Sequence, residues 1–104
     1  MSQFEVYPNP ARQRQAYPYV VQLQSDVAAV TPREVVIAPL VPASMLAVRE
    51  AVLLPLVHVS DRDYRLCVPM LGTAPANQLA NPIGDVSESR WKILAAIDHL
   101  FTGG

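Results

Sequence analysis

The stretch Leu53–Val68, "LLPLVHVSDRDYRLCV", contains two apolar runs separated by a short polar segment. The first run is "LLPLVHV" (53–59), the second is "DYRLCV" (63–68), and "SDR" (60–62) lies between them. Two runs rich in β-branched and aromatic residues that flank a short polar turn predict a β-hairpin. The stretch therefore indicates a fold built from antiparallel strands.

Further strands are predicted before this hairpin. "QFEVY" (3–7) alternates, with Phe4 and Val6 on one face and Glu5 and Tyr7 on the other. This period of two is typical of a half-buried strand. The pattern continues in "YVVQLQ" (19–24), where Tyr19, Val21 and Leu23 share a face, and in "EVVIAPL" (34–40), which we expect to end at proline.

The segments 43–51 and 72–84 are less regular. The first contains no helix breaker and is expected to be a short helical or looped excursion. The second is rich in Gly, Pro and Asn, which predicts a loop that holds at most one short helical turn. Because the ten prolines are spread from position 8 to position 82, no long helix is expected before residue 83.

A helix is predicted over residues 85–101, "DVSESRWKILAAIDHLF". Asp85 and Glu88 have the spacing of a capping box, and Ser87 is an alternative N-cap. Gly103 suits the left-handed position that ends many helices. The apolar stripe expected at intervals of three and four consists of Trp91, Leu94, Ile97, Leu100 and Phe101. The prediction is a mainly β protein with one C-terminal helix.

Length and composition limit the possible classes. A chain of 104 residues predicts a single domain over 1–104. The hydrophobic fraction of 51% and the charged fraction of 16% exclude intrinsic disorder. The net charge of −1 argues against direct nucleic-acid binding. The first residues lack the charged and apolar regions of a signal peptide, and no apolar run is long enough to span a membrane.

Few residues suggest chemistry. The single cysteine, Cys67, cannot form an internal disulfide, and no Cys/His cluster suggests a metal or cofactor, which fits a cytoplasmic setting. His58, His99, Cys67 and the turn "SDRDYR" (60–65) are interpreted as structural or solvated residues. A catalytic His–carboxylate pair, a reactive thiol or a metal site in the turn are the functional alternatives. No catalytic residue is predicted.

Several stretches together are similar to the CcdB family of bacterial toxins. They are Gln3–Tyr7, "VQLQSD" (21–26) followed by "VVIAPL", and "LPLVHVSDRDYRL" (54–66). The final helix, "ILAAIDHLFTGG", also agrees in phase and in its distance from the carboxyl end. The resemblance covers nearly the whole chain.

The resemblance implies an SH3-like β-barrel of the CcdB/MazF-like type, assembled as a homodimer. In such a dimer Leu94, Ile97 and Phe101 of the helix are expected to pack. It also implies a toxin of a type II toxin–antitoxin system that serves plasmid maintenance. Such toxins bind the A subunit of DNA gyrase, trap its complex with cleaved DNA, and are neutralised by a CcdA-like antitoxin. They are topoisomerase inhibitors and not enzymes.

The resemblance places the gyrase contact on the last residues of the chain. The family has tryptophan, glycine and isoleucine there, and this chain has Thr102, Gly103 and Gly104. Supporting positions carried over from the family are Val27, Ala28, Asp98 and Phe101, of which Asp98 replaces an amide. The threonine lacks the aromatic face that would stack on a cation.

Two alternatives follow from these substitutions and from the fold. In the first, the protein dimerises and binds antitoxin but no longer poisons gyrase, because the Trp and Ile positions are Thr102 and Gly104. In the second, it is an endoribonuclease like a related toxin family, with Arg12, Arg14 and Arg33 supplying charge. The overall negative charge argues against the second.

Overall fold

The structure is a computed structural model, which describes residues 2–11, 16–25, 34–46 and 51–103. Within these residues a seven-stranded antiparallel sheet is followed by one α-helix, α1 (Arg90–Thr102). The strands are β1 (Glu5–Pro8), β2 (Tyr19–Gln22), β3 (Glu34–Pro42), β4 (Leu56–Val59), β5 (Arg62–Leu66), β6 (Gly72–Pro75) and β7 (Gly84–Asp85). The predicted class, mainly β with a C-terminal helix, is confirmed.

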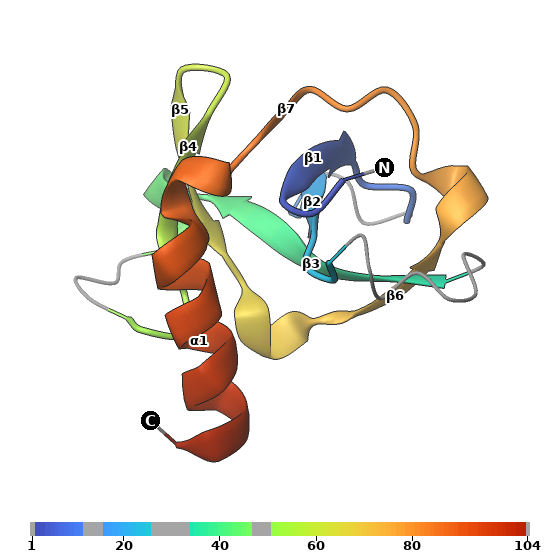
Figure 1. Cartoon of the computed structure of the whole chain (residues 1–104). Helices are drawn as coiled ribbons and strands as arrows, with labels where there is room; N and C mark the ends of the chain where they lie inside the picture. The colour runs from blue at the N-terminus through green and yellow to red at the C-terminus, as the bar shows by residue number, and fades with distance from the viewer. Residues whose placement is uncertain (1, 12–15, 26–33, 47–50, 104) are drawn as a thin grey trace.

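The sheet curls into a nearly closed barrel (Figure 1). Its strand order is β4-β5-β3-β2-β1-β7, and β6 pairs with β3 beside this path. The two ends of the order meet, because a Cβ added to Gly84 of β7 would lie 3.1 Å from Cγ2 of Val59 in β4. A glycine at position 84 therefore lets the last strand approach the first closely.

The predicted hairpin is present as β4 and β5. Val59 pairs with Arg62, so the turn consists of Ser60 and Asp61 alone, and Arg62 belongs to the strand instead of the turn. The two turn residues have φ values of 52° and 62°. Two successive positive φ values define a type I′ turn, whose twist matches that of the flanking strands.

Strand β3 extends two residues beyond the predicted range 34–40 and ends at Pro42, so Pro39 lies inside it. Its residues 34–37 pair with β6 and its residues 40–42 pair with β5, both on the same side. The carbonyl of Pro39 accepts from the amide of Cys67 on that side, 2.9 Å away. The ring nitrogen of Pro39 therefore faces the gap between the two partner strands, where the ladder needs no N–H donor.

The segment 72–84 contains more structure than expected. Gly72–Pro75 forms β6 against β3, and Gly84 begins β7 against β1. The short helical turn expected in this loop is found at Ala76–Gln78. In the segment 43–51, Ala43–Met45 forms a 3₁₀ turn, and residues 47–50 lie outside the described part.

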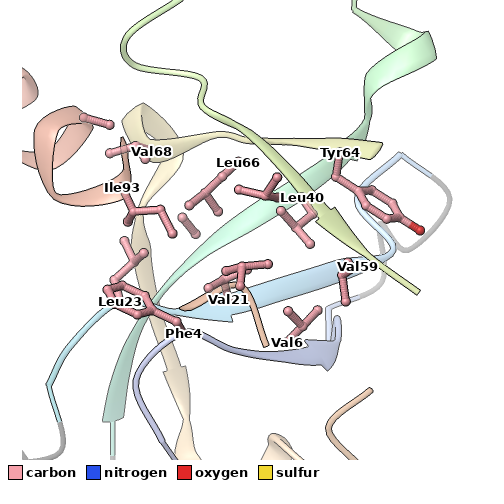
Figure 2. Packing of buried hydrophobic residues seen from close by; sticks show 14 residues of the cluster. Phe4, Val6, Val21, Leu23, Leu40, Val59, Tyr64, Leu66, Val68 and Ile93 are labelled. Carbon is pink, nitrogen blue, oxygen red and sulfur yellow. The ribbon is translucent and has the colours of Figure 1, made fainter. Parts of the chain in front are cut away.

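Two buried clusters lie on opposite faces of the strands. The larger fills the barrel and includes Phe4, Val6, Val21, Leu40 and Leu66, together with Ile93 of α1 (Figure 2). The smaller lies on the other face and consists of Tyr7, Val20, Val35, Ala74 and Leu79. The predicted alternation in residues 3–7 and 19–24 is confirmed.

The helix begins later than predicted. Residues 87–89 form a 3₁₀ turn and α1 begins at Arg90, so Asp85 and Glu88 do not form a capping box. Asp85 instead accepts hydrogen bonds from the hydroxyl and the amide of Ser87. Both bonds lower the pKa of Asp85 below its ordinary value of 3.8, and the bond from the hydroxyl contributes more than the bond from the amide.

The buried face of α1 also differs from the predicted stripe. Ile93 and Ala96 are fully buried, and Leu94, Ile97 and Leu100 pack partly against the barrel. Trp91 is 78% exposed and therefore lies off the buried face. In a helix with many apolar residues, more than one set of them recurs at intervals of three and four. In α1 the set that contains Ile93 is the one that packs on the barrel.

Candidate functional site at the end of α1

The last turns of α1 extend beyond the sheet (Figure 1). Gly103 ends the helix with a φ of 79°, and its amide donates to the carbonyl of His99 over 3.0 Å. The hydroxyl of Thr102 donates to the carbonyl of Asp98, 2.7 Å away, and lies 3.2 Å from the Asp98 carboxylate. The helix end is thus closed by its own side chain and by a left-handed glycine.

Phe101 lies on this projecting end and is 69% exposed. Leu94 and Ile97 precede it by seven and four residues, so the three share one side of α1. The first two are partly buried against the barrel, whereas the phenyl ring of Phe101 reaches solvent. An aromatic side chain of this size in solvent is available to a partner.

The structure brings together several of the residues predicted to bind gyrase. Asp98, Phe101, Thr102 and Gly103 are exposed and lie within the last turn and a half of the helix. The other three, Val27, Ala28 and Gly104, lie outside the described residues. The same holds for Arg12, Arg14 and Arg33, which the endoribonuclease alternative would require.

The first turn of α1 carries a second group of aromatic and cationic side chains. The guanidinium of Arg90 lies 5.7 Å from the ring centroid of Phe4 and 5.8 Å from that of Trp91. It also donates to Oε1 of Gln3 over 3.3 Å. Phe4 itself is buried with a φ of 67°, a rare backbone conformation for an aromatic residue. These contacts connect the start of the helix to the two residues that precede β1.

The residues considered for catalysis are found in structural or exposed settings. Nδ1 of His58 lies 2.9 Å from the carboxylate of Asp63, and both side chains are largely in solvent on the hairpin. His99 is exposed on α1. Cys67 is buried, and this burial raises the pKa of its thiol above the ordinary value of 9.0. Within the described residues, no three His, Cys, Asp or Glu side chains gather as metal ligands would.

A family model described as "CcdB protein" matches residues 3–103 of the chain. The chain belongs to the CcdB family. Membership supports a general role as a gyrase-inhibiting toxin of a toxin–antitoxin system, and the family is one of gyrase poisons and not of known enzymes. In the part of the chain that the structure describes, no helix is long and apolar enough to cross a membrane.

Sequence reasoning missed the exposure of Trp91 and a groove between α1 and the segment that leads into β4. The signal for Trp91 was present in the helix, because Ile93, Ala96 and Leu100 also recur at three and four residues. That phase places Trp91 outside the buried stripe. The groove could not have been found in this way, since Leu56 and Lys92 meet across 36 positions of sequence.

Proposed function

We propose that this CcdB-family protein is a toxin whose α1 end binds the A subunit of DNA gyrase and traps the complex of gyrase with cleaved DNA. The observation that carries the proposal is the projecting helix end with its exposed Phe101. No catalytic group is required, because the toxin acts by occupying its target. A CcdA-like antitoxin would neutralise it, and the protein would work in the cytoplasm.

The proposed contact surface consists of Asp98, Phe101 and residues 102–104, supported by Val27 and Ala28. Phe101 supplies the aromatic area that Thr102 lacks. Buried aromatic side chains at an interface centre can each contribute more than about 2 kcal/mol to binding. The Thr102 hydroxyl is engaged within its own helix, so Phe101 is the anchor expected in this chain.

A homodimer is part of the proposal. Leu94, Ile97 and Phe101 form an apolar side of α1 that the barrel covers only in part. A second copy could cover Leu94 and Ile97 and only the near edge of Phe101, so that the rest of this ring, at the projecting end of each helix, would still face the target. Analytical ultracentrifugation of the purified protein tests this assembly.

One observation favours a second candidate function. Thr102 and Gly103 complete the helix end by hydrogen bonds within α1, and neither offers a large apolar side chain. A protein with such a tail could retain antitoxin binding without poisoning gyrase. It would then act as a repressor partner or as a sink for antitoxin.

A cleavage assay with purified gyrase separates the two functions. Under the first, the wild-type protein traps cleaved DNA, and Phe101→Ala weakens the effect by about 30-fold, as expected for a loss of roughly 2 kcal/mol. Met45→Ala is the matched control, because Met45 has the same 69% exposure on a different element. The expected result for this control is unchanged trapping.

The double variant Thr102→Trp, Gly104→Ile decides in favour of the second candidate if it alone traps cleaved DNA. If neither the wild type nor this variant traps cleaved DNA or binds gyrase A in a pull-down, the gyrase proposal is wrong. Incubation of the same preparation with RNA tests the endoribonuclease alternative, for which specific cleavage is the positive result.

A further inference from the structure

Trp91, in the first turn of α1, is the most exposed large apolar side chain in the part of the chain that the structure describes. Its one ring contact there is with the guanidinium of Arg90, and its indole N–H has no hydrogen-bond partner among the same residues. Apolar area that stays in water contributes nothing to folding, whereas its burial by a partner is favourable. Trp91 therefore offers a partner both apolar area and a hydrogen-bond donor, the combination that enriches tryptophan at interfaces.

The side of α1 that carries Trp91 continues to the end of the helix. An α-helix has 3.6 residues per turn, so the residues four, seven and eleven positions after Trp91 lie on the same side. They are Ala95, Asp98 and Thr102, and all of them are exposed. We call these four residues the outer line of α1. At a rise of 1.5 Å per residue, the outer line extends about 16 Å from Trp91 to the helix end proposed to bind gyrase.

Two cations flank Trp91, and both are oriented by neutral acceptors. Nη1 of Arg90 donates to Oε1 of Gln3 over 3.3 Å. Nζ of Lys92 donates to the carbonyl of Leu56 over 2.9 Å. Among the described residues neither cation has a carboxylate within ion-pair distance, and the exposed Glu88 on the preceding 3₁₀ turn pairs with neither. The start of the outer line therefore fits an acidic surface, because both charges are uncompensated.

We propose that Trp91 is a second anchor for the A subunit of DNA gyrase, which would lie along the outer line of α1 as well as against its end. The inference rests on the proposed function and adds to it a residue three turns away from the C-terminal contact. Tryptophan and arginine are enriched among the residues that dominate binding energies. The target would bury the indole ring and place carboxylates opposite Arg90 and Lys92. Trp91 would thus determine specificity, because only a target with this combination gains the second contact.

The position of Trp91 favours the target over a second copy of the chain. The proposed dimer uses Leu94 and Ile97, which pack partly against the barrel. The outer line lies instead on the side of α1 opposite the buried Ile93 and Ala96. In a symmetric contact centred on Trp91, the two flanking cations would face their own counterparts, and like charges at close range are unfavourable. The outer line would therefore stay accessible to the target in the dimer.

The test measures binding of the full chain to purified gyrase A by isothermal titration calorimetry, together with trapping of cleaved DNA. Trp91→Ala should weaken binding at least about tenfold, as expected for an anchor residue. Trp91→Phe, which keeps an aromatic ring, should weaken it about threefold or less. Met45→Ala is again the control, because Met45 is an exposed apolar side chain on a different element, and it should bind like the wild type.

Lys92→Gln tests the acidic surface expected opposite the start of the outer line. It should weaken binding about threefold, and the affinity of the variant should depend less on salt than that of the wild type. Arg62→Gln, which removes an exposed cation on the hairpin, should change neither quantity. If Lys92→Gln strengthened binding, or left both the affinity and its salt dependence unchanged, the proposal would be wrong.

Two measurements exclude an indirect effect of Trp91→Ala. Its urea midpoint should equal that of the wild type, because the side chain is exposed, and analytical ultracentrifugation should show the same oligomeric state. Weaker binding together with a smaller assembly would assign Trp91 to the dimer and overturn the proposal. In the double variant with Phe101→Ala, the two fold-changes should multiply, since the residues lie about 15 Å apart along the helix.

These results separate the second anchor from the proposed function. If the wild type binds gyrase A, Phe101→Ala weakens this binding and Trp91→Ala does not, the second anchor is refuted and the proposed function stands. If the wild type neither binds gyrase A nor traps cleaved DNA, the proposed function fails and the inference fails with it.

Discussion

The attachment of α1 to the barrel can be tested with one substitution, Ile93→Ala. Ile93 is fully buried in the barrel cluster, where it is the largest helix side chain (Figure 2). The change removes three carbon atoms, which at about 0.8 kcal/mol for each methylene amounts to roughly 2.4 kcal/mol. The cavity left behind raises the loss to about 3 kcal/mol, within the usual range for such substitutions.

A loss of this size is a large part of the free energy of unfolding of a small domain, about 5–15 kcal/mol. Urea denaturation followed by circular dichroism should show a lower midpoint with an unchanged slope. Thermal melting should shift down by roughly 10–20 °C. The milder Ile93→Val should lose only about 1 kcal/mol, because one methylene is removed.

Trp91→Ala provides the opposite control on the same helix. Trp91 is larger than Ile93 but 78% exposed, so its removal should change the free energy of unfolding by no more than about 0.5 kcal/mol. If Trp91→Ala were as destabilising as Ile93→Ala, the assignment of the buried face of α1 would be wrong. The sequence-based stripe that included Trp91 would then be correct.

Three further predictions concern the turn, the thiol and the 3₁₀ turn. Asp61→Gly should stabilise the protein by about 0.5–1 kcal/mol in thermal melts, because glycine adopts the positive φ of this turn without steric strain. Arg62→Gly, one position later in β5, should destabilise it by a similar amount, because glycine in a strand loses more conformational freedom on folding. The thiol of Cys67 should react with iodoacetamide at pH 8 at least about 100-fold more slowly in the native protein than in urea, because the protein must open locally before the reagent reaches the thiol. Equal rates would show that the thiol is exposed in the native protein. The pKa of Asp85 is lowered in the folded state, so the ionised carboxylate stabilises the protein above about pH 4 and this stabilisation is lost at lower pH. Asp85→Asn should therefore flatten the pH dependence of the free energy of unfolding below about pH 4. An unchanged pH profile would argue against the hydrogen bonds from Ser87.

Much of the fold was predictable because its signals are local. The alternation of Phe4, Val6 and Tyr7 assigns each side chain to the correct face, and the hairpin needs only a turn between two apolar runs. Strand β6 was missed because "GTAP" has little intrinsic preference for a strand. It is extended because it pairs with residues 34–37, and this distant pairing leaves no local sequence signal.

The start and the phase of α1 were mispredicted for two different reasons. Asp85 has the right side chain for an N-cap, but the same carboxylate can bond two residues ahead, which favours the turn through Ser87. The side of α1 that faces the barrel was ambiguous, because apolar residues lie on several sides of the helix and Ala95 and Ala96 can be either buried or exposed. The site residues at 98, 101, 102 and 103 could be placed together, since they follow one another on the helix.

The contact between Val59 and Gly84 has a consequence for biosynthesis. Closing the barrel requires β7, and the barrel cluster also requires Ile93 and Ala96. A nascent chain that has emerged only as far as β6 therefore lacks both the last strand and the helix that complete the interior. Domains fold as units during translation, so this one can reach its final form only after residue 96 has left the ribosome. If the protein poisons an enzyme of its own cell, as proposed, it would thus stay inactive until nearly the whole chain has been made, and an antitoxin could bind it as it folds.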